Sequence, residues 1–458
     1  MGQLHTDLRN SYRFSHLVPA VLALLISIGM TIAFWPGVGT WEVIQFSQQR
    51  SLPVMNDWKS PFVAVLYWLS DDLFSSTGPI LFVQQALFWT GLALLAMNTF
   101  SSLKGQVIFF LTAAVLPPLW IAEIMLWKEA LTLSFLSLSV GATFAHLRTG
   151  RRLYAVVATL SAILIAATRH NAVLLTFPTF FVVARSMANQ ASFALRKYRR
   201  MIFITAFVIL MLMALGFSWV MNKKGVQRCH IWHHALLWDL TAISISEEQM
   251  LIPDAFRRTG DAGSLENLRH HFTPYNSDPL FFGKRAPLRL YGTAWSGCDE
   301  QPPLDMLLKS WLETVLNNPG AYLRHRFIYL IHLLNFPDVS QDRFGIAYYR
   351  IDSEFTPSAN RSELFKLLRT NPIYEALALG IPIRGGIYLI VFLLSVIVLS
   401  RNSSTQNIYL WVLWLAGLAY FASFLAIGSG ALMRYLSVYA VLGPALLAGR
   451  WGIQFQKS

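Results

Sequence analysis

Long apolar runs separated by short polar connections dominate the chain. A helix that crosses the hydrocarbon core of a bilayer needs about 20 mainly apolar residues. Apolar and polar positions do not alternate within the runs, as they would in transmembrane strands. The pattern predicts an all-α polytopic membrane protein with about ten transmembrane helices, at residues 14–35, 79–98, 106–124, 126–147, 153–168, 172–184, 201–221, 381–399, 407–427 and 431–448.

Two stretches of the chain depart from this pattern. Residues 62–74 are apolar but too short to span a bilayer, so we expect an interfacial helix there. Residues 222–378 are polar, with apolar positions at helical spacing, which predicts one mostly helical extracytoplasmic domain. Within that domain, residues 310–335 are expected to form two helices around Asn318 and Pro319, and residues 322–336 either lie on the surface or enter the bilayer.

These patterns divide the chain into three parts. Residues 1–221 form an N-terminal transmembrane module, whose first outer loop covers residues 36–75. The extracytoplasmic domain follows at residues 222–378, and C-terminal transmembrane helices occupy residues 379–458.

Basic residues gather in the short connections between apolar runs. Arg9 and Arg13 precede the first run, and the basic segment 148–152 follows the fourth. Because cytoplasmic loops carry an excess of Lys and Arg, this distribution predicts that both termini are cytoplasmic. Charged residues make up 13% of the chain, against about 25% in a soluble domain. The net charge of +13 follows the predicted topology, so we expect no nucleic-acid partner.

Polar residues next to the predicted spans gather on one side of the membrane. Ionisable side chains at membrane depth are costly and usually face a cavity or a partner. Snorkelling at the bilayer boundary explains one such residue better than an ordered set of acids and bases. The distribution therefore indicates a site at the outer face, from Glu42, Asp57 and Lys59 in the first outer loop and Lys128, Glu129, Arg169, His170, Asn171 and Arg434 at the outer ends of later spans.

Each type of residue in this set suits a step of group transfer. A partly desolvated carboxylate, here Glu42 or Asp57, can take a proton from an acceptor hydroxyl. Basic side chains offset the charge that builds on a phosphate leaving group. Three tryptophans at the same level form either a sugar-stacking floor or, as we favour, part of the interfacial aromatic belt. The basic side chains are Lys128, Arg169 and Arg434, and the tryptophans are Trp41, Trp58 and Trp127.

The chain has two cysteines, Cys229 and Cys298, and both lie in the polar domain. An extracytoplasmic position makes them a candidate disulfide, and two free thiols are the alternative. The histidine-rich segment 229–234 (CHIWHH) has helical spacing, but no second ligand pair has zinc spacing, so a structural or surface role is favoured. The chain has no P-loop, GxGxxG or HExxH motif.

The order of several short motifs resembles that of bacterial integral-membrane glycosyltransferases of the GT-C class. The resemblance covers most of the chain, and the order of the motifs carries it, because each motif is short. The motifs are Trp41-Glu42 with Gln45, Asp57-Trp58-Lys59-Ser60-Pro61, Leu126-Trp127-Lys128-Glu129, Arg169-His170-Asn171, Arg434-Tyr435, and a helix pair with Trp311, Asn318, Pro319, Tyr322 and Arg326.

The resemblance implies transfer of a sugar from an undecaprenyl-phosphate type of lipid carrier to an envelope glycan or glycolipid, such as O-antigen. It places the protein in the bacterial inner membrane among membrane lipids, with the site facing the periplasm and a flippase and a carrier-loading glycosyltransferase as partners. The class uses a carboxylate of the first outer loop as base, which by position is Glu42, with Asp57 as the alternative. Many relatives have Asp in place of Glu42 and His in place of Lys59.

No cofactor is firmly implied by this resemblance. Use of a divalent metal varies across the class, and the sequence contains no clear metal site. Two other functions fit a polytopic envelope protein, namely an O-antigen polymerase-like protein and a flippase or transporter. The acidic residues directly after the first span favour the transferase, and the absence of charge from residues 17–34 and 389–399 is unlike a transporter pathway.

Overall fold

The computed structural model describes residues 2–37, 41–115, 123–191, 193–223, 226–293, 297–298, 300–334, 385–400, 405–428 and 436–454. The described chain is almost entirely helical, which confirms the all-α prediction. Within these residues the one sheet pairs two short parallel strands, β1 (Met55–Asn56) and β2 (Val226–Gln227).

Six helical segments of the described chain are long and apolar enough to cross a membrane. They belong to α1 (Gly2–Phe34), α4 (Gly78–Thr99), α7 (Lys128–Thr149), η1 (His170–Thr176) with α9 (Phe177–Asn189), η2 (Phe193–Tyr198) with α10 (Arg199–Lys223), and α20 (Thr405–Ile427). Shorter apolar segments lie in α5 (Leu103–Val115), α8 (Arg152–Thr168), α19 (Gly385–Ser400) and α21 (Tyr439–Gln454). By length and composition these are the helices of a membrane protein.

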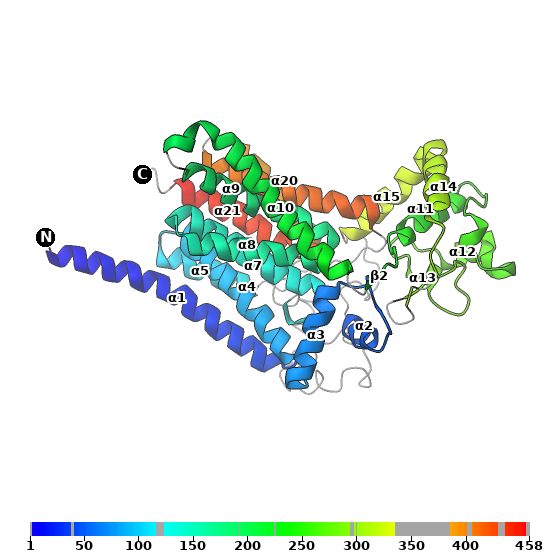
Figure 1. Cartoon of the computed structure of the whole chain (residues 1–458), viewed down its shortest axis with the longest axis horizontal. Helices are drawn as coiled ribbons and strands as arrows, with labels where there is room; N and C mark the ends of the chain where they lie inside the picture. The colour runs from blue at the N-terminus through cyan, green and yellow to red at the C-terminus, as the bar shows by residue number, and fades with distance from the viewer. Residues whose placement is uncertain are drawn as a thin grey trace.

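The helices of this bundle run side by side, and α7 is buried along most of its length (Figure 1). It packs against α4 on one side and α8 on the other. Gly91 and Gly141 permit the close α4–α7 contact, because a Cβ on Gly141 would lie 2.2 Å from the carbonyl oxygen of Gly91. A similar Cβ on Gly91 would lie 2.2 Å from the backbone of Ser137. The polar N-terminus of α7 is therefore held at the centre of the bundle.

The first outer loop folds into two helices across one end of the bundle, α2 (Trp41–Arg50) and α3 (Pro61–Phe74) (Figure 1). The helix expected at residues 62–74 is present as α3. Its start is set by Pro61 at the first position and by Ser60, whose Oγ accepts a hydrogen bond from the Val63 N–H at 3.3 Å. One face of α3 is buried, whereas Leu69, Leu73 and Phe74 are exposed.

The polar part of the chain after α10 forms a group of short helices at the same end as α2 and α3 (Figure 1). These are α11 (His233–Ser246), η3 (Asp254–Phe256), η4 (Gly260–Gly263), α12 (Leu265–His271), α13 (Asp278–Phe281), α14 (Leu304–Asn317) and α15 (Pro319–Leu333). The two helices predicted around Asn318 and Pro319 are confirmed as α14 and α15. We call residues 226–334 the outer module. The rest of the domain predicted at residues 222–378 lies outside the described residues from 335 onward.

Both ends of the described chain lie at the opposite end of the bundle from the outer module. The start of α1 and the end of α21 are both on that side (Figure 1). The bundle therefore separates the chain ends from the residues of the first outer loop.

Candidate active site

Glu42 lies in the first turn of α2 and is buried, with 3% of its surface exposed. Its Oε1 accepts a hydrogen bond from Nζ of Lys59 at 3.2 Å and lies 3.7 Å from Nζ of Lys128. Its Oε2 accepts a hydrogen bond from the backbone N–H of Lys128 at 3.3 Å. One carboxylate thus joins the first outer loop to the start of α7.

The start of α7 explains why the carboxylate is held there. Trp127 precedes the helix in an extended conformation, and its side chain makes no capping hydrogen bond. The first N–H groups of a helix lack intrahelical partners and carry a partial positive charge. Glu42 supplies an acceptor to one of these groups across 86 residues of sequence. This contact by itself stabilises the start of α7. Whether the carboxylate can also take part in chemistry depends on the charged side chains around it.

A second buried ion pair lies one residue further along α7. Glu129, 3% exposed, pairs with Nη1 of Arg169 at the end of α8. The Arg169 guanidinium also donates from Nε to Oδ1 of Asn171 at 3.3 Å and lies 5.3 Å above the ring of Phe424. Asn171 in turn donates to Oγ of Ser423 at 3.1 Å. This pair connects α7, η1 and α20.

The two pairs give the site a net positive charge. Three cations, on Lys59, Lys128 and Arg169, face two carboxylates, on Glu42 and Glu129, so the sum is 3 − 2 = +1. Buried ion pairs are weak evidence for stability, because desolvation offsets much of their attraction. The excess cation instead suits an anionic ligand such as a phosphate group.

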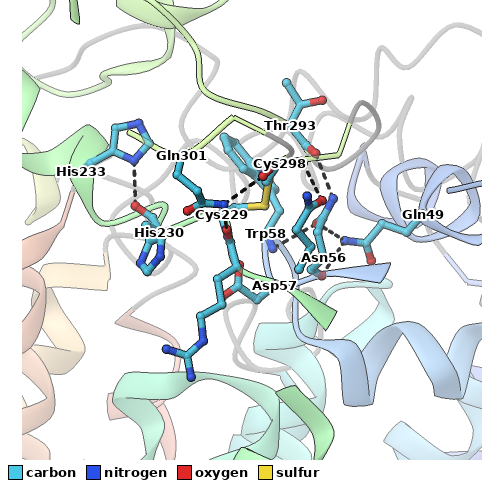
Figure 2. The surroundings of a disulfide bond; sticks show 12 residues. Gln49, Asn56, Asp57, Trp58, Cys229, His230, His233, Thr293, Cys298 and Gln301 are labelled. Atoms are coloured by element: carbon cyan, nitrogen blue, oxygen red, sulfur yellow. Dashed lines mark hydrogen bonds between the residues drawn. A yellow bond between two sulfur atoms is a disulfide. The ribbon is translucent and has the colours of Figure 1, made fainter. Parts of the chain in front are cut away.

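Asp57 is hydrogen-bonded to the outer module, beside Cys229 (Figure 2). Its Oδ1 accepts the backbone N–H of Cys229 at 2.6 Å, and its own N–H donates to the carbonyl oxygen of Gln227 at 3.0 Å. Ser60, three residues later, donates to the carbonyl oxygen of Ala167 at 2.7 Å. Asp57 and Ser60 therefore fix both sides of Lys59.

Cys229 and Cys298 form a disulfide next to Asp57, with Cα atoms 5.2 Å apart (Figure 2). The N–H of Cys298 donates to Oε1 of Gln227 at 2.8 Å. Asn56 extends this network, because its Nδ2 donates to the carbonyl oxygen of Thr293 at 3.0 Å. The disulfide joins the two segments of the outer module that hold residues 55–57.

The structure describes only some of the remaining predicted residues. Gln45 is buried on α2, and its Oε1 has no hydrogen-bond partner among the described residues. His170 begins η1 and is exposed. Trp41 begins α2, but its side chain is not described, and Arg434 and Tyr435 lie outside the described residues.

The environment of Trp127 differs from the one expected of an interfacial aromatic belt. The interfacial-belt interpretation is wrong for Trp127, because 97% of its surface is covered by the rest of the protein in the hydrophobic core. Trp58 is half-buried and also contacts protein, with its ring centroid 5.2 Å from that of His234 and 6.4 Å from that of Phe282. Tertiary packing therefore surrounds the ring of Trp127 and covers part of the ring of Trp58.

The histidine-rich segment packs into the outer module. His234 stacks on Phe281 at 3.9 Å between ring centroids, and Nδ1 of His233 lies 2.7 Å from the carbonyl oxygen of His230. Burial lowers the pKa of His233 to about 4, so its ring is neutral at neutral pH. In the part of the chain that is described, no group of three His, Cys, Asp or Glu side chains could hold a metal ion.

Sequence reasoning missed a buried network in the outer module. Asp239 on α11 is fully buried, and its Oδ2 accepts hydrogen bonds from Nη2 of Arg326 at 2.7 Å and from Nε1 of Trp311 at 3.0 Å. His325 lies 3.4 Å from the other carboxylate oxygen. The available signal was a single acidic residue within the otherwise apolar helix at residues 233–246.

Comparisons with protein-family models, curated proteins and solved structures find no match for this chain. Its function is inferred here from the chemistry of the site. A buried carboxylate between two ammonium groups, like that of Glu42, can take a proton, while such cations bind and neutralise an anionic leaving group.

Proposed function

We propose that the protein is a membrane-bound glycosyltransferase of the GT-C type. It moves a sugar from an undecaprenyl-phosphate type of carrier to an envelope glycan or lipid acceptor, such as O-antigen, at the outer face of the bacterial inner membrane. The observation that carries this proposal is the buried Glu42 carboxylate, held between the ammonium groups of Lys59 and Lys128 at the N-terminus of α7.

The proposed topology has ten spans, formed by the six long apolar segments and the four shorter ones. Both termini are cytoplasmic, and the outer module is periplasmic. Two observations support this orientation. The chain ends lie on the side of the bundle away from the outer module (Figure 1). The disulfide in the outer module is typical of an oxidising compartment such as the periplasm.

In the proposed reaction, the acceptor oxygen forms a bond with the anomeric carbon of the donor sugar. The bond between that carbon and the phosphate oxygen breaks, and its electron pair leaves with the polyprenyl phosphate. Glu42 takes the proton of the acceptor hydroxyl. Lys59, Lys128 and Arg169 offset the additional negative charge on the departing phosphate.

The resting contacts of Glu42 suggest how donor binding prepares the base. Lys59 and Lys128 both stabilise the ionised carboxylate before substrate enters. A bound phosphate competes for the same ammonium groups. As these move toward the phosphate, the Glu42 carboxylate is less well stabilised and accepts a proton more readily. Base strength and donor binding are thereby linked.

The hydrogen bonds of Asp57 support Glu42 as the base. The Asp57 carboxylate receives the Cys229 N–H at 2.6 Å, so it acts on the position of Lys59 through the backbone. Asp57 is accordingly a positioning residue in this mechanism.

One observation favours transport of an envelope glycan, a flippase function, as the second candidate. Glu123 is fully buried between α4 and α7, where Ser134 donates to its Oε2 at 2.8 Å. Gln84 and Gln85 both donate to its backbone carbonyl. Its Oε1 has no partner within the described ranges. Ionisable groups buried among membrane helices are often found on transport pathways.

A transfer assay with purified protein and undecaprenyl-phosphate sugars tests the proposal, with released carrier measured by mass spectrometry. We expect Glu42→Gln to lower the rate by roughly 10²- to 10⁴-fold, the usual contribution of a general base. Glu313→Gln is the matched control, because Glu313 is an exposed acid on α14. An active Glu42→Gln would remove Glu42 as base, and carrier that crosses vesicles without cleavage would favour the flippase.

A further inference from the structure

Tyr67 on α3 is buried beside the site but has no role in the mechanism above. Its side chain belongs to the buried face of α3 and is 4% exposed. Its hydroxyl oxygen is inaccessible to solvent and has no hydrogen-bond partner within the described part of the chain. A buried hydroxyl without a partner costs free energy, so its retention needs a reason.

The packing of the ring places Tyr67 against the helix that carries Glu42. The rings of Tyr67 and Phe46 are stacked, with centroids 5.0 Å apart and planes at 20°. Phe46 lies four residues after Glu42 on α2, so the two share one face of that helix. Trp68 holds α3 to α2 here, because its Nε1 donates to the Phe46 carbonyl at 2.7 Å.

The electrostatics of the phenol agree with this position. Burial raises the pKa of Tyr67 well above its ordinary value, and the carboxylates of Glu42 and Glu129 raise it further. The hydroxyl therefore stays protonated at neutral pH and can donate a hydrogen bond. The phenol is therefore within electrostatic reach of both carboxylates of the site.

The Tyr67 hydroxyl is thus a hydrogen-bond donor that packing holds in place and that has no acceptor among the described residues. Each carboxylate of the site is engaged by cations, namely Lys59 and Lys128 on Glu42 and Arg169 on Glu129. An anionic ligand that draws these cations toward itself would enter the same region as the phenol. A phosphate oxygen is a strong acceptor for such a donor.

We propose that Tyr67 is a phosphate-binding residue, whose hydroxyl donates a hydrogen bond to a phosphate oxygen of the lipid carrier. The identity of the carrier rests on the proposed function, whereas the phosphate chemistry rests on the site itself. The phenol of α3 joins three other donors. These are Lys59 before α3, Lys128 at the start of α7 and Arg169 at the end of α8.

Binding of undecaprenyl phosphate to the purified full-length protein in nanodiscs tests this inference without any transfer step. Tyr67→Phe keeps the ring that stacks on Phe46 and removes only the hydroxyl. We expect carrier binding to weaken roughly 10- to 100-fold, the range for a hydrogen bond to a charged group. Wild-type affinity in Tyr67→Phe, or no binding by the wild-type protein, would overturn the proposal.

Tyr409→Phe is the matched control, because Tyr409 on α20 is also a buried tyrosine. Tyr409 packs on Phe144, away from the site residues, and its variant should bind carrier like the wild type. Equal weakening in both variants would contradict a specific role for Tyr67. The thermal midpoint of ligand-free Tyr67→Phe should not fall, since the lost hydroxyl had no partner; a fall together with weaker binding would indicate a structural role.

Inorganic phosphate separates the two sources of this ligand chemistry. Inorganic phosphate should compete with the carrier for the site. If its own binding is also weakened in Tyr67→Phe, the contact belongs to the phosphate group alone. Weakening confined to the lipid carrier would assign it to the phosphate as presented by the membrane. Glu42→Gln in the transfer assay remains a separate test, so failure of the proposed reaction does not by itself remove phosphate binding by Tyr67.

Discussion

Adjacent charges in the sequence do not pair with each other in this site. Lys128 and Glu129 are neighbours at the start of α7, yet Lys128 contacts Glu42 and Glu129 contacts Arg169. Successive helical side chains point in directions too different for mutual contact, so each reaches another element. One short motif thereby contributes to two ion pairs, and both come to lie in the same site.

Lys59 provides the sharpest single-residue prediction. Lys59→Met keeps most of the aliphatic stem but removes the charge that contacts Glu42 and would bind phosphate. We expect kcat/KM for carrier-linked sugar to fall by roughly 10- to 100-fold, in line with loss of a charge-assisted hydrogen bond. Lys59→His should retain part of the activity, because many enzymes of the class that the motif order resembles have His at this position.

Lys309→Met is the control for this prediction. Lys309 is an exposed residue of α14 that pairs only weakly with Glu313, at 3.9 Å. Steady-state kinetics, measured in identically prepared membranes, would compare Lys59→Met, Lys59→His and Lys309→Met directly. A Lys59→Met enzyme with wild-type kcat/KM would exclude the proposed role of this ammonium group.

At the scale of elements, hydrogen bonds to two different parts of the protein hold the segment between β1 and α3. Asp57 accepts the Cys229 N–H of the outer module, and Ser60 both caps α3 and donates to the end of α8. Lys59 lies between them and reaches Glu42. The position of the lysine therefore depends on the outer module as well as on the membrane helices.

Loss of the disulfide should loosen this segment. In the chain-entropy model, a bridge across 69 residues stabilises a fold by about 4 kcal/mol. We expect the Cys229→Ser/Cys298→Ser double variant to have a lower thermal midpoint and reduced transfer. Dithiothreitol should produce the same losses in the wild type and no further change in the double variant. Full activity after complete reduction would show that Asp57 and Lys59 are held without the bridge.

At the scale of the whole molecule, one arginine of a buried ion pair connects the outer module to the bundle. Arg326 on α15 binds Asp239 and also donates from Nη1 to the carbonyl oxygen of Gly428 at 2.8 Å, directly after α20. Gly428 also lies close to Tyr329, since a Cβ there would approach the phenol oxygen to 2.2 Å. The contact therefore ties the end of α20 to the outer module.

Replacing one member of this ion pair should lower the free energy of unfolding more than replacing both members. Asp239→Asn leaves the Arg326 charge buried, and loss of one partner of a buried pair typically costs about 3–5 kcal/mol. We expect a marked fall in the thermal midpoint for Asp239→Asn, and a smaller fall for Asp239→Asn/Arg326→Met than the two single effects together. Strict additivity of the measured unfolding free energies would indicate that the two side chains do not interact.

Much of the fold could be predicted because its main signals are local. Run length and polarity are read along a few turns, which is why α3, the boundary between α14 and α15, and the six long apolar segments lie where the sequence indicated. The pairing within the site is not local. Glu42 and Lys128 are 86 residues apart, and Asp57 and Cys229 are 172 apart, so composition alone could not assign their partners.

The sequence by itself determined that this is a helical membrane protein, and it predicted that acids and bases gather near the ends of several spans. The bilayer imposes those features, since each span must be apolar and each charge must find water or a partner. Tertiary structure alone decided that Glu42 caps α7, that Trp127 is buried and that Tyr67 stacks on Phe46 of the helix that carries Glu42. These depend on close packing between distant helices, which no local pattern encodes.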